Sequence, residues 1–94
     1  PSGIISIDKG AYNALIHDGK SLLPSGITDA TGNFESGDVV DLSYDSKVFA
    51  RGISWYPGKD IEKIKGKNTK EIKDILGYKD YDEIIHRNNL FIFN

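Results

Sequence analysis

The chain has 94 residues, of which 38% are hydrophobic, and its twelve basic and fourteen acidic side chains give a net charge of −2. This length fits one domain with a modest core, and no apolar stretch approaches the length of a membrane span. The absence of cysteine excludes disulfides and thiolate metal sites, and the slight acidic excess argues against dedicated nucleic-acid binding, which relies on lysine and arginine.

The beginning of the chain predicts a strand followed by a helix. Residues 4–7 form a β-branched run that is typical of a strand. Asp8 then occupies the position of a helix N-cap, where its carboxylate can accept the free amide hydrogens of the first turn. Apolar residues recur at helical spacing over residues 9–18, and Gly19 supplies the stop.

Residues 19–27 predict the hinge of the fold. They place two leucines between a Gly-Lys-Ser turn and a Pro-Ser-Gly turn. We expect Leu22 and Leu23 to reach the core because the glycines and the proline let the backbone bend sharply around them. Strand patterns follow this hinge, beginning with residues 27–34.

The middle of the chain predicts a β-hairpin. Residues 40–44 alternate apolar and polar side chains, as a strand with one solvated face should. Residues 45–47 have the composition of a hairpin turn, and residues 48–55 form the return strand. Gly52 lies within that strand and indicates a bulge or a close backbone approach.

The sequence after residue 58 again predicts helices. Ile61 and Ile64 mark one or two helical turns. Asn68 and Glu71 have the spacing of a capping box, with asparagine in place of serine or threonine. An apolar stripe follows them, and we expect Gly77 to end this second helix.

Two short strands are predicted at the end of the chain, at residues 83–86 and 90–93, separated by a turn. Strands therefore outnumber helices. We expect residues 1–94 to form a single domain that is mainly β with short helices (α+β), built as a small mixed-strand pseudo-barrel.

No residue pattern in the sequence carries catalytic chemistry. Residues 19–21 match the end of a phosphate-binding P-loop, but Ala14 stands where the first glycine of that loop belongs. His17 and His86 have no partner at metal-ligand spacing, and we expect His86 to be a packing residue or an anion contact. We therefore expect this chain alone to be no enzyme and to hold no metal or cofactor.

Two features bear on nucleic-acid binding. Residues 59–73 contain six lysines interleaved with acids and isoleucines, a mixture more typical of a solvated helix face than of a binding site. Trp55, Tyr56, Phe91 and Phe93 can stack on bases, but aromatic residues on the strands of a small domain are more often core.

Motifs along nearly the whole chain resemble those of PUA domains, the small barrels named for pseudouridine synthases and archaeosine transglycosylases. The part from the first helix to Leu-Leu-Pro is common to many PUA domains: Ile7-Asp8-Lys9-Gly10-Ala11 and Lys20-Ser21-Leu22-Leu23-Pro24-Ser25-Gly26-Ile27. The matching segments continue with Thr31-Gly32-Asn33-Phe34 and Gly37-Asp38-Val39-Val40. The tail, Ile75-Leu76-Gly77-Tyr78 and His86-Arg87-Asn88-Asn89-Leu90, resembles more narrowly the PUA domain at the C-terminus of bacterial glutamate 5-kinases.

This resemblance implies a parent enzyme that transfers the γ-phosphoryl group of ATP to the side-chain carboxylate of glutamate, opening proline biosynthesis, and that is inhibited by proline. ATP and Mg²⁺ would belong to a kinase domain outside these 94 residues. The chain would be a cytoplasmic, non-catalytic accessory or regulatory domain whose partners are the kinase domain and other subunits, not a membrane. Residues 1–3 fit a domain cut from the end of a longer protein.

The alternative implied by the resemblance is an RNA-binding module. PUA domains that bind RNA use the first helix and the glycine-containing loop after it. The matching positions are Lys9, Gly10, Asn13, Lys20, Ser21, Leu22, Leu23 and Gly26. Only two of these are basic and aspartates lie close to them in the sequence, so the charge favours the regulatory role over RNA.

Overall fold

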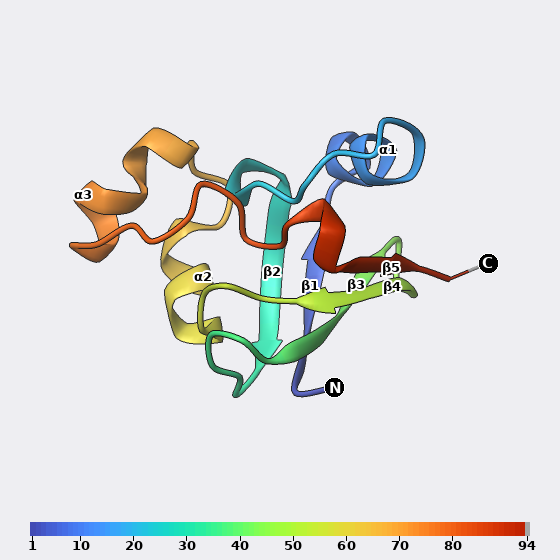
Figure 1. The fold of residues 1–94 in the computed structure, drawn as a ribbon, viewed down its shortest axis with the longest axis horizontal. Helices are drawn as coiled ribbons and strands as arrows, with labels where there is room; N and C mark the ends of the chain where they lie inside the picture. The colour runs from blue at the N-terminus through green and yellow to red at the C-terminus, as the bar shows by residue number, and fades with distance from the viewer. Residues whose placement is uncertain (94) are drawn as a thin grey trace.

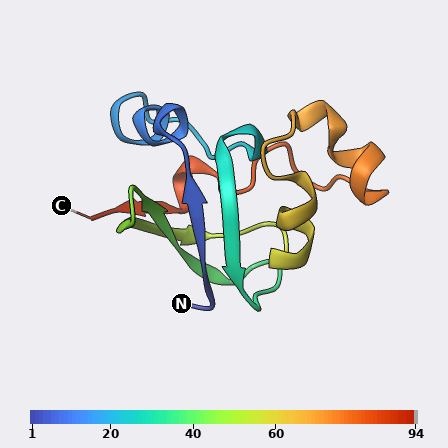
Figure 2. The ribbon, with the colours of Figure 1, turned by 180° about the vertical axis from the view of Figure 1, so that it is seen from behind.

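The computed structural model describes residues 1–93 and arranges them around a five-stranded sheet with strand order β2-β1-β3-β4-β5 (Figures 1 and 2). The strands are β1 (Gly3–Ile7), β2 (Ile27–Gly32), β3 (Val39–Tyr44), β4 (Lys47–Ile53) and β5 (Leu90–Ile92). β1 and β3 are parallel, and the other neighbouring strands are antiparallel. The expected α+β fold with mixed strands is confirmed.

The helices lie at the edges of this sheet. In Figure 1, α1 (Lys9–His17) lies above the strands, and α2 (Gly58–Ile64) and α3 (Ile72–Leu76) lie to their left. Three short 3₁₀ helices join the elements, at Pro24–Gly26, Thr69–Glu71 and Arg87–Asn89. The fully buried core lies between the sheet and these helices, and its largest side chains include Tyr56, Phe34 and Ile5.

The predicted helix ends and the predicted hairpin turn are confirmed. The Asp8 carboxylate accepts a hydrogen bond from the backbone N–H of Ala11 at 2.8 Å. Gly77 ends α3 with a φ of +83°, a backbone conformation that suits glycine. Asp45 and Ser46 both have positive φ, as a two-residue hairpin turn requires.

Two further predictions are confirmed in a modified form. Both halves of the capping box at Asn68 and Glu71 are present, but the box caps the 3₁₀ helix that leads into α3. Gly52 marks a close approach, because a Cβ there would lie 2.8 Å from the Ile85 side chain. The bulge in this hairpin lies elsewhere, where β3 shifts register between Leu42 and Ser43.

The predicted strand at residues 83–86 is wrong. Only an isolated bridge between Leu22 and Ile85 forms there. The backbone of this segment divides its hydrogen bonds between two partners, since Leu22 N–H donates to Ile85 at 2.9 Å and Trp55 N–H donates to Ile84 at 2.8 Å. Ile84 and Ile85 are both buried, so the alternation of a strand is lost.

Three strands end earlier than predicted, and Leu23 does not reach the core. β2 ends at Gly32 and β4 ends at Ile53, each two residues before the predicted end, and β5 ends at Ile92, one residue before it. Leu22 is 1% exposed but Leu23 is 43% exposed. Neighbouring residues of an extended segment point to opposite sides, so the bridge that turns Leu22 inward turns Leu23 outward.

The expectation that the strand aromatics are core residues is only partly met. Tyr56 is fully buried, whereas Phe91 is 67% exposed and Phe93 is 36% exposed. β5 is an edge strand, and the inward positions beside Phe91 are taken by Leu90 and Ile92. The two phenylalanines therefore lie on the outside of the sheet.

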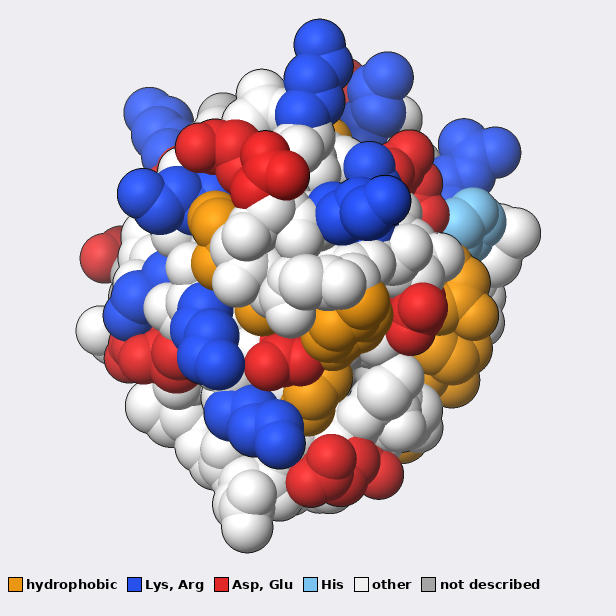
Figure 3. Space-filling view, turned by 90° about the vertical axis from the view of Figure 1, so that its left-hand side faces the viewer, with side chains coloured by type: hydrophobic (Ala, Val, Ile, Leu, Met, Phe, Trp, Pro, Cys, Tyr) orange, Lys and Arg blue, Asp and Glu red, His pale blue; other side chains and the backbone are white. Residues whose placement is uncertain are grey.

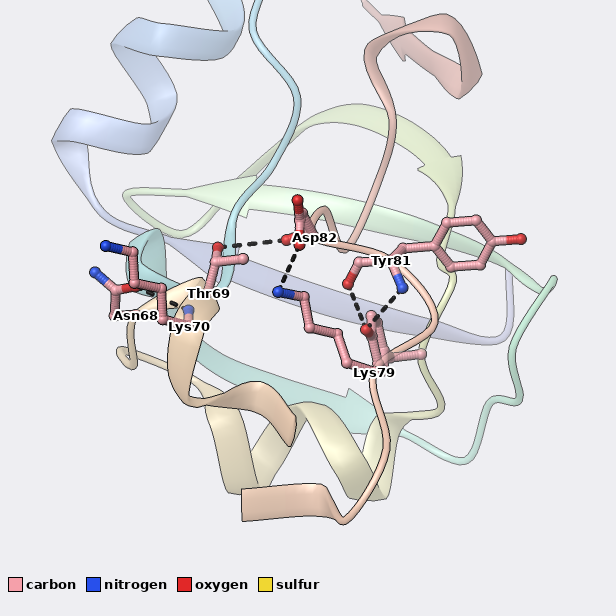
Figure 4. Close-up of polar contacts among 7 residues, drawn as sticks. Asn68, Thr69, Lys70, Lys79, Tyr81 and Asp82 are labelled. Atoms are coloured by element: carbon pink, nitrogen blue, oxygen red, sulfur yellow. Dashed lines mark hydrogen bonds and ion pairs between the residues drawn. The ribbon is translucent and has the colours of Figure 1, made fainter. Parts of the chain in front are cut away.

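Polar contacts fix the segment between α3 and residue 84 against the rest of the fold (Figure 4). The buried Tyr56 hydroxyl accepts a hydrogen bond from Tyr81 N–H at 3.1 Å and donates to the Tyr81 carbonyl. Lys79 Nζ pairs with Asp82 Oδ1 at 2.7 Å. Thr69 Oγ1 also donates to the Asp82 carbonyl at 3.4 Å.

A tyrosine on this segment holds the one carboxylate that is buried among residues 1–93. Asp60 is 8% exposed, and the Tyr78 hydroxyl donates a hydrogen bond to Asp60 Oδ2. Tyr78 itself is 37% exposed. Partial desolvation of its phenol, the hydrogen bond and the nearby Asp60 charge raise the pKa of Tyr78 above its usual value. The protonated phenol therefore stabilises the folded state.

We expect stability to fall in alkaline solution because of this pair. A raised folded pKa means that the contribution is complete below about pH 10, where the unfolded phenol titrates, and is lost as the pH rises further. Tyr78→Phe should cost about 1–3 kcal/mol near neutral pH, since it removes a partner of a buried carboxylate. Urea unfolding at pH 7 and above pH 10 measures both effects.

The matched control is Tyr81→Phe, whose hydroxyl points away from the polar contacts in Figure 4. It should leave stability within about 0.5 kcal/mol of the parent chain. A Tyr78→Phe variant that matched this control at pH 7 would contradict the assigned role of the pair.

Candidate functional site

A groove lies between α1 and the predicted hinge at residues 19–27, around a cavity of about 470 Å³. Most of the contact residues predicted from the sequence line this cavity: Gly10, Lys20, Ser21, Leu22, Leu23 and Gly26. Lys9 and Asn13 lie exposed on α1 and are not part of the lining. The structure thus brings together the loop residues and one helix residue, and their role in binding remains a prediction.

One wall of the groove depends on a close contact between the loop and the start of α1. Asp8 N–H donates to the Gly26 carbonyl at 2.9 Å, while the Asp8 side chain caps the helix. A Cβ on Gly26 would lie 2.4 Å from the Cβ of Ala11. Only glycine lets the loop lie this close to the helix.

The opposite end of the loop is tied to α1 and to the last part of the chain. Lys20 N–H donates to the Ala14 carbonyl at 3.1 Å, and Gly19 adopts a φ of +61° to allow this turn. Ser21 Oγ accepts a hydrogen bond from Arg87 N–H at 3.0 Å. The hydroxyl of Ser21 therefore holds the loop to the 3₁₀ helix at Arg87–Asn89.

The chemistry of the groove suits binding. Its lining includes two alanines and three leucines, with one ammonium group on Lys20 and one carboxylate on Asp8. The carboxylate is already engaged as the helix cap. Such a lining can hold an apolar or planar group and one anionic group, but it offers no acid–base pair.

Among residues 1–93, no three His, Asp or Glu side chains gather as metal ligands. Within the same residues, no helix has both the length and the apolar character needed to cross a membrane.

The lysine-rich end of the molecule, formed by α2, α3 and the turn between them, has the character of a solvated surface. Figure 3 shows its lysines interspersed with acidic side chains. Lys65 Nζ lies 3.2 Å from Glu62 and 3.6 Å from Asp29, and the hydrogen bond to Glu62 is the main cause of the raised pKa of Lys65. This end therefore presents no uniform basic patch.

A second hollow, of about 410 Å³, was not predicted from the sequence. The Tyr12 ring on α1 stacks on Tyr44 with centroids 4.4 Å apart and meets Phe49 edge-on at 4.8 Å. Phe93 also lines the hollow. These residues come from separate parts of the chain, so no local motif indicates that they meet.

Curated relatives of the chain are glutamate 5-kinases, and the match lies in their C-terminal part. The chain is 50% identical over 95 residues to the glutamate 5-kinase of Dictyoglomus thermophilum, covering 100% of this chain and 26% of that protein. It is 51% identical over 92 residues to that of Thermoanaerobacter sp. strain X514, covering 97% and 25%. The chain thus spans about a quarter of the length of these relatives.

Solved structures and a family model point to the same fold. A PUA domain protein from Aeropyrum pernix K1, crystallised with tartrate, has a TM-score of 0.63 at 23% identity over 90% of this chain and 41% of its own. A conserved PUA domain protein from Thermoplasma acidophilum has a TM-score of 0.54 at 22% identity over 63% and 39%. Residues 3–76 match the family model described as PUA domain, and the chain therefore belongs to the PUA domain family.

Proposed function

We propose that the chain is a non-catalytic accessory domain of a glutamate 5-kinase, which acts by contact with the kinase part or with neighbouring subunits. The observation that carries this proposal is the identity of about half of all residues, along the whole chain, with glutamate 5-kinases. The groove supports a binding role over a catalytic one, since the carboxylate in its lining is already engaged as the cap of α1.

In this proposal the phosphoryl transfer from ATP to glutamate belongs to the rest of the polypeptide. ATP, Mg²⁺ and glutamate would all bind there, and this chain would hold no cofactor of its own. Its place in the cell would be that of the kinase, in the cytoplasm. Any effect of the domain on activity or on proline inhibition would then pass through a protein contact.

The test is to delete residues 1–94 from the full-length kinase. We expect turnover of glutamate and ATP to persist, because the catalytic groups lie elsewhere, while proline inhibition, Mg²⁺ dependence or subunit assembly changes. Steady-state kinetics at several proline and Mg²⁺ concentrations, with sedimentation of the same samples, measures each effect. A truncated kinase that matched the full-length protein in all three properties would end this proposal.

RNA binding at the groove is the second candidate function. The cavity beside α1 favours it, because the residues that match the RNA-contacting positions of PUA domains lie around one opening. Lys20 is the only lysine or arginine that lines this opening, which argues for weak binding. In an NMR titration with a structured RNA, this function requires shifts confined to the groove that fade as salt is raised.

A further inference from the structure

The sheet carries an exposed apolar surface on the side opposite the core. Core residues alternate along each strand with residues that point outward. We call the outer face the part of this outward set that comprises Ile4, Val39, Asp41, Arg51, Phe91 and Phe93. The outward residues beside it on β1, β2 and β3 include the polar Ser6, Thr31 and Ser43.

Strand register aligns four of these residues in one row across the sheet. Ile4 pairs with Asp41, Asp41 with Arg51, and Arg51 with Phe91. Arg51 Nε lies 2.9 Å from Asp41 Oδ1, so the two charges of the row neutralise each other. The apolar side chains of Ile4 and Phe91, on either side of this ion pair, are exposed.

Aromatic rings dominate the β5 end of the row. The Phe91 and Phe93 ring centroids lie 5.8 Å apart, and the Arg51 guanidinium lies 5.5 Å from the Phe93 centroid. Phe91 keeps two-thirds of its surface exposed, since its relative accessibility is 67%. This arrangement positions a large apolar area at the surface instead of burying it.

Such a surface is typical of a protein contact. The solvated face of an antiparallel sheet is ordinarily polar, and contiguous exposed apolar side chains mark contact sites. A nucleic-acid surface would need free cations, whereas the one cation of the outer face is paired with Asp41. An apolar protein surface with a few polar groups at its centre is the partner that fits this chemistry.

We propose that the outer face docks onto the kinase part of the same polypeptide, and this inference rests on the proposed function. The glutamate 5-kinases align with this chain in their C-terminal part, so the kinase part precedes residue 1. Ser2 N–H donates to the Val39 carbonyl at 2.9 Å, which ties the incoming backbone to the edge of the outer face. A partner tethered there has an effective concentration of about a millimolar or more.

Cysteine labelling tests this contact, because the chain has no cysteine of its own. Phe91→Cys is placed in the full-length kinase, with its other cysteines replaced, and in the 94-residue chain, which has its own buried core. We expect the thiol to react about tenfold more slowly in the full-length kinase than in the 94-residue chain. A tenfold protection corresponds to a free energy of docking of about 1.4 kcal/mol. Val39→Cys serves as the second probe if Phe91→Cys does not fold.

The matched control is Ile75→Cys on α3, an exposed apolar position (38%) on a different element. Its labelling rate should be the same in both proteins. Equal rates for Cys at position 91 in both proteins would overturn the proposal. Two other results would also overturn it. One is protection of the cysteine at position 91 in the isolated chain that grows with the concentration of the chain, which indicates self-association. The other is protection of this cysteine that appears only when RNA is added.

The deletion experiment separates this inference from the function on which it rests. If deletion alters proline inhibition while position 91 stays equally reactive, the accessory function stands and the outer face is not the contact. If deletion changes nothing while position 91 is protected, the contact exists and the accessory function fails.

Discussion

Leu22→Ala is expected to destabilise the chain by about 2–5 kcal/mol, the usual cost of cutting a buried leucine back to alanine. Leu22 is 1% exposed, and its backbone pairs with the segment around Ile85. The lost methyl groups leave a cavity between the hinge and the segment around Ile85. This cavity can close only if the hinge and that segment both move. For a chain of this size such a loss is a large share of the whole stability. Urea unfolding followed by tryptophan fluorescence measures it.

Leu23→Ala is the matched control, since it removes the same atoms from the neighbouring residue. Leu23 is 43% exposed, so we expect a change below about 1 kcal/mol. Both leucines line the groove. Comparing the two variants therefore also distinguishes an effect on the groove from a loss of stability. Equal losses at the two positions would contradict the assignment of Leu22 alone to the core.

Local signals predicted much of the fold because they depend on a few consecutive residues. Asp8 caps α1, Gly77 ends α3, and Asp45 and Ser46 form the hairpin turn, each through contacts within one turn of chain. The residues around the groove, by contrast, were predicted from the resemblance to PUA domains. α1 and the hinge follow each other directly, so their residues lie close together once the chain folds back at Gly19.

The predictions that were wrong concern segments whose structure depends on contacts between distant parts of the chain. Residues 83–86 contain a run that resembles a strand, but they bond to both Leu22 and Trp55, far apart in the sequence. Phe91 is apolar and was expected in the core, yet the register of β5 on β4 turns it outward. Neither the partner nor the register of a strand can be read from its own residues, so the outer face had no sequence signature.

Gly26→Ala is expected to destabilise the chain by about 1–3 kcal/mol and to open the groove. The new methyl group would lie 2.4 Å from the Cβ of Ala11 and 3.5 Å from its Cα, so the loop and α1 have to separate. Separation would also lengthen the hydrogen bond from Asp8 N–H to the Gly26 carbonyl, now 2.9 Å. Thermal unfolding gives the loss, and amide shifts at Asp8 and along the loop report the displacement.

Gly10→Ala is the control, because Gly10 lines the same cavity and the substitution adds the same methyl group. Its Cβ would meet only Asp8 Oδ1, at an ordinary 3.5 Å, and Gly10 lies in the first turn of α1. Alanine is favoured over glycine in a helix by about 0.5–1 kcal/mol, so this variant should be as stable as the parent or more stable. The two substitutions should thus shift the unfolding midpoint in opposite directions. A Gly26→Ala chain that unfolded at the same temperature as the Gly10→Ala chain would mean that the loop does not need its close contact with α1.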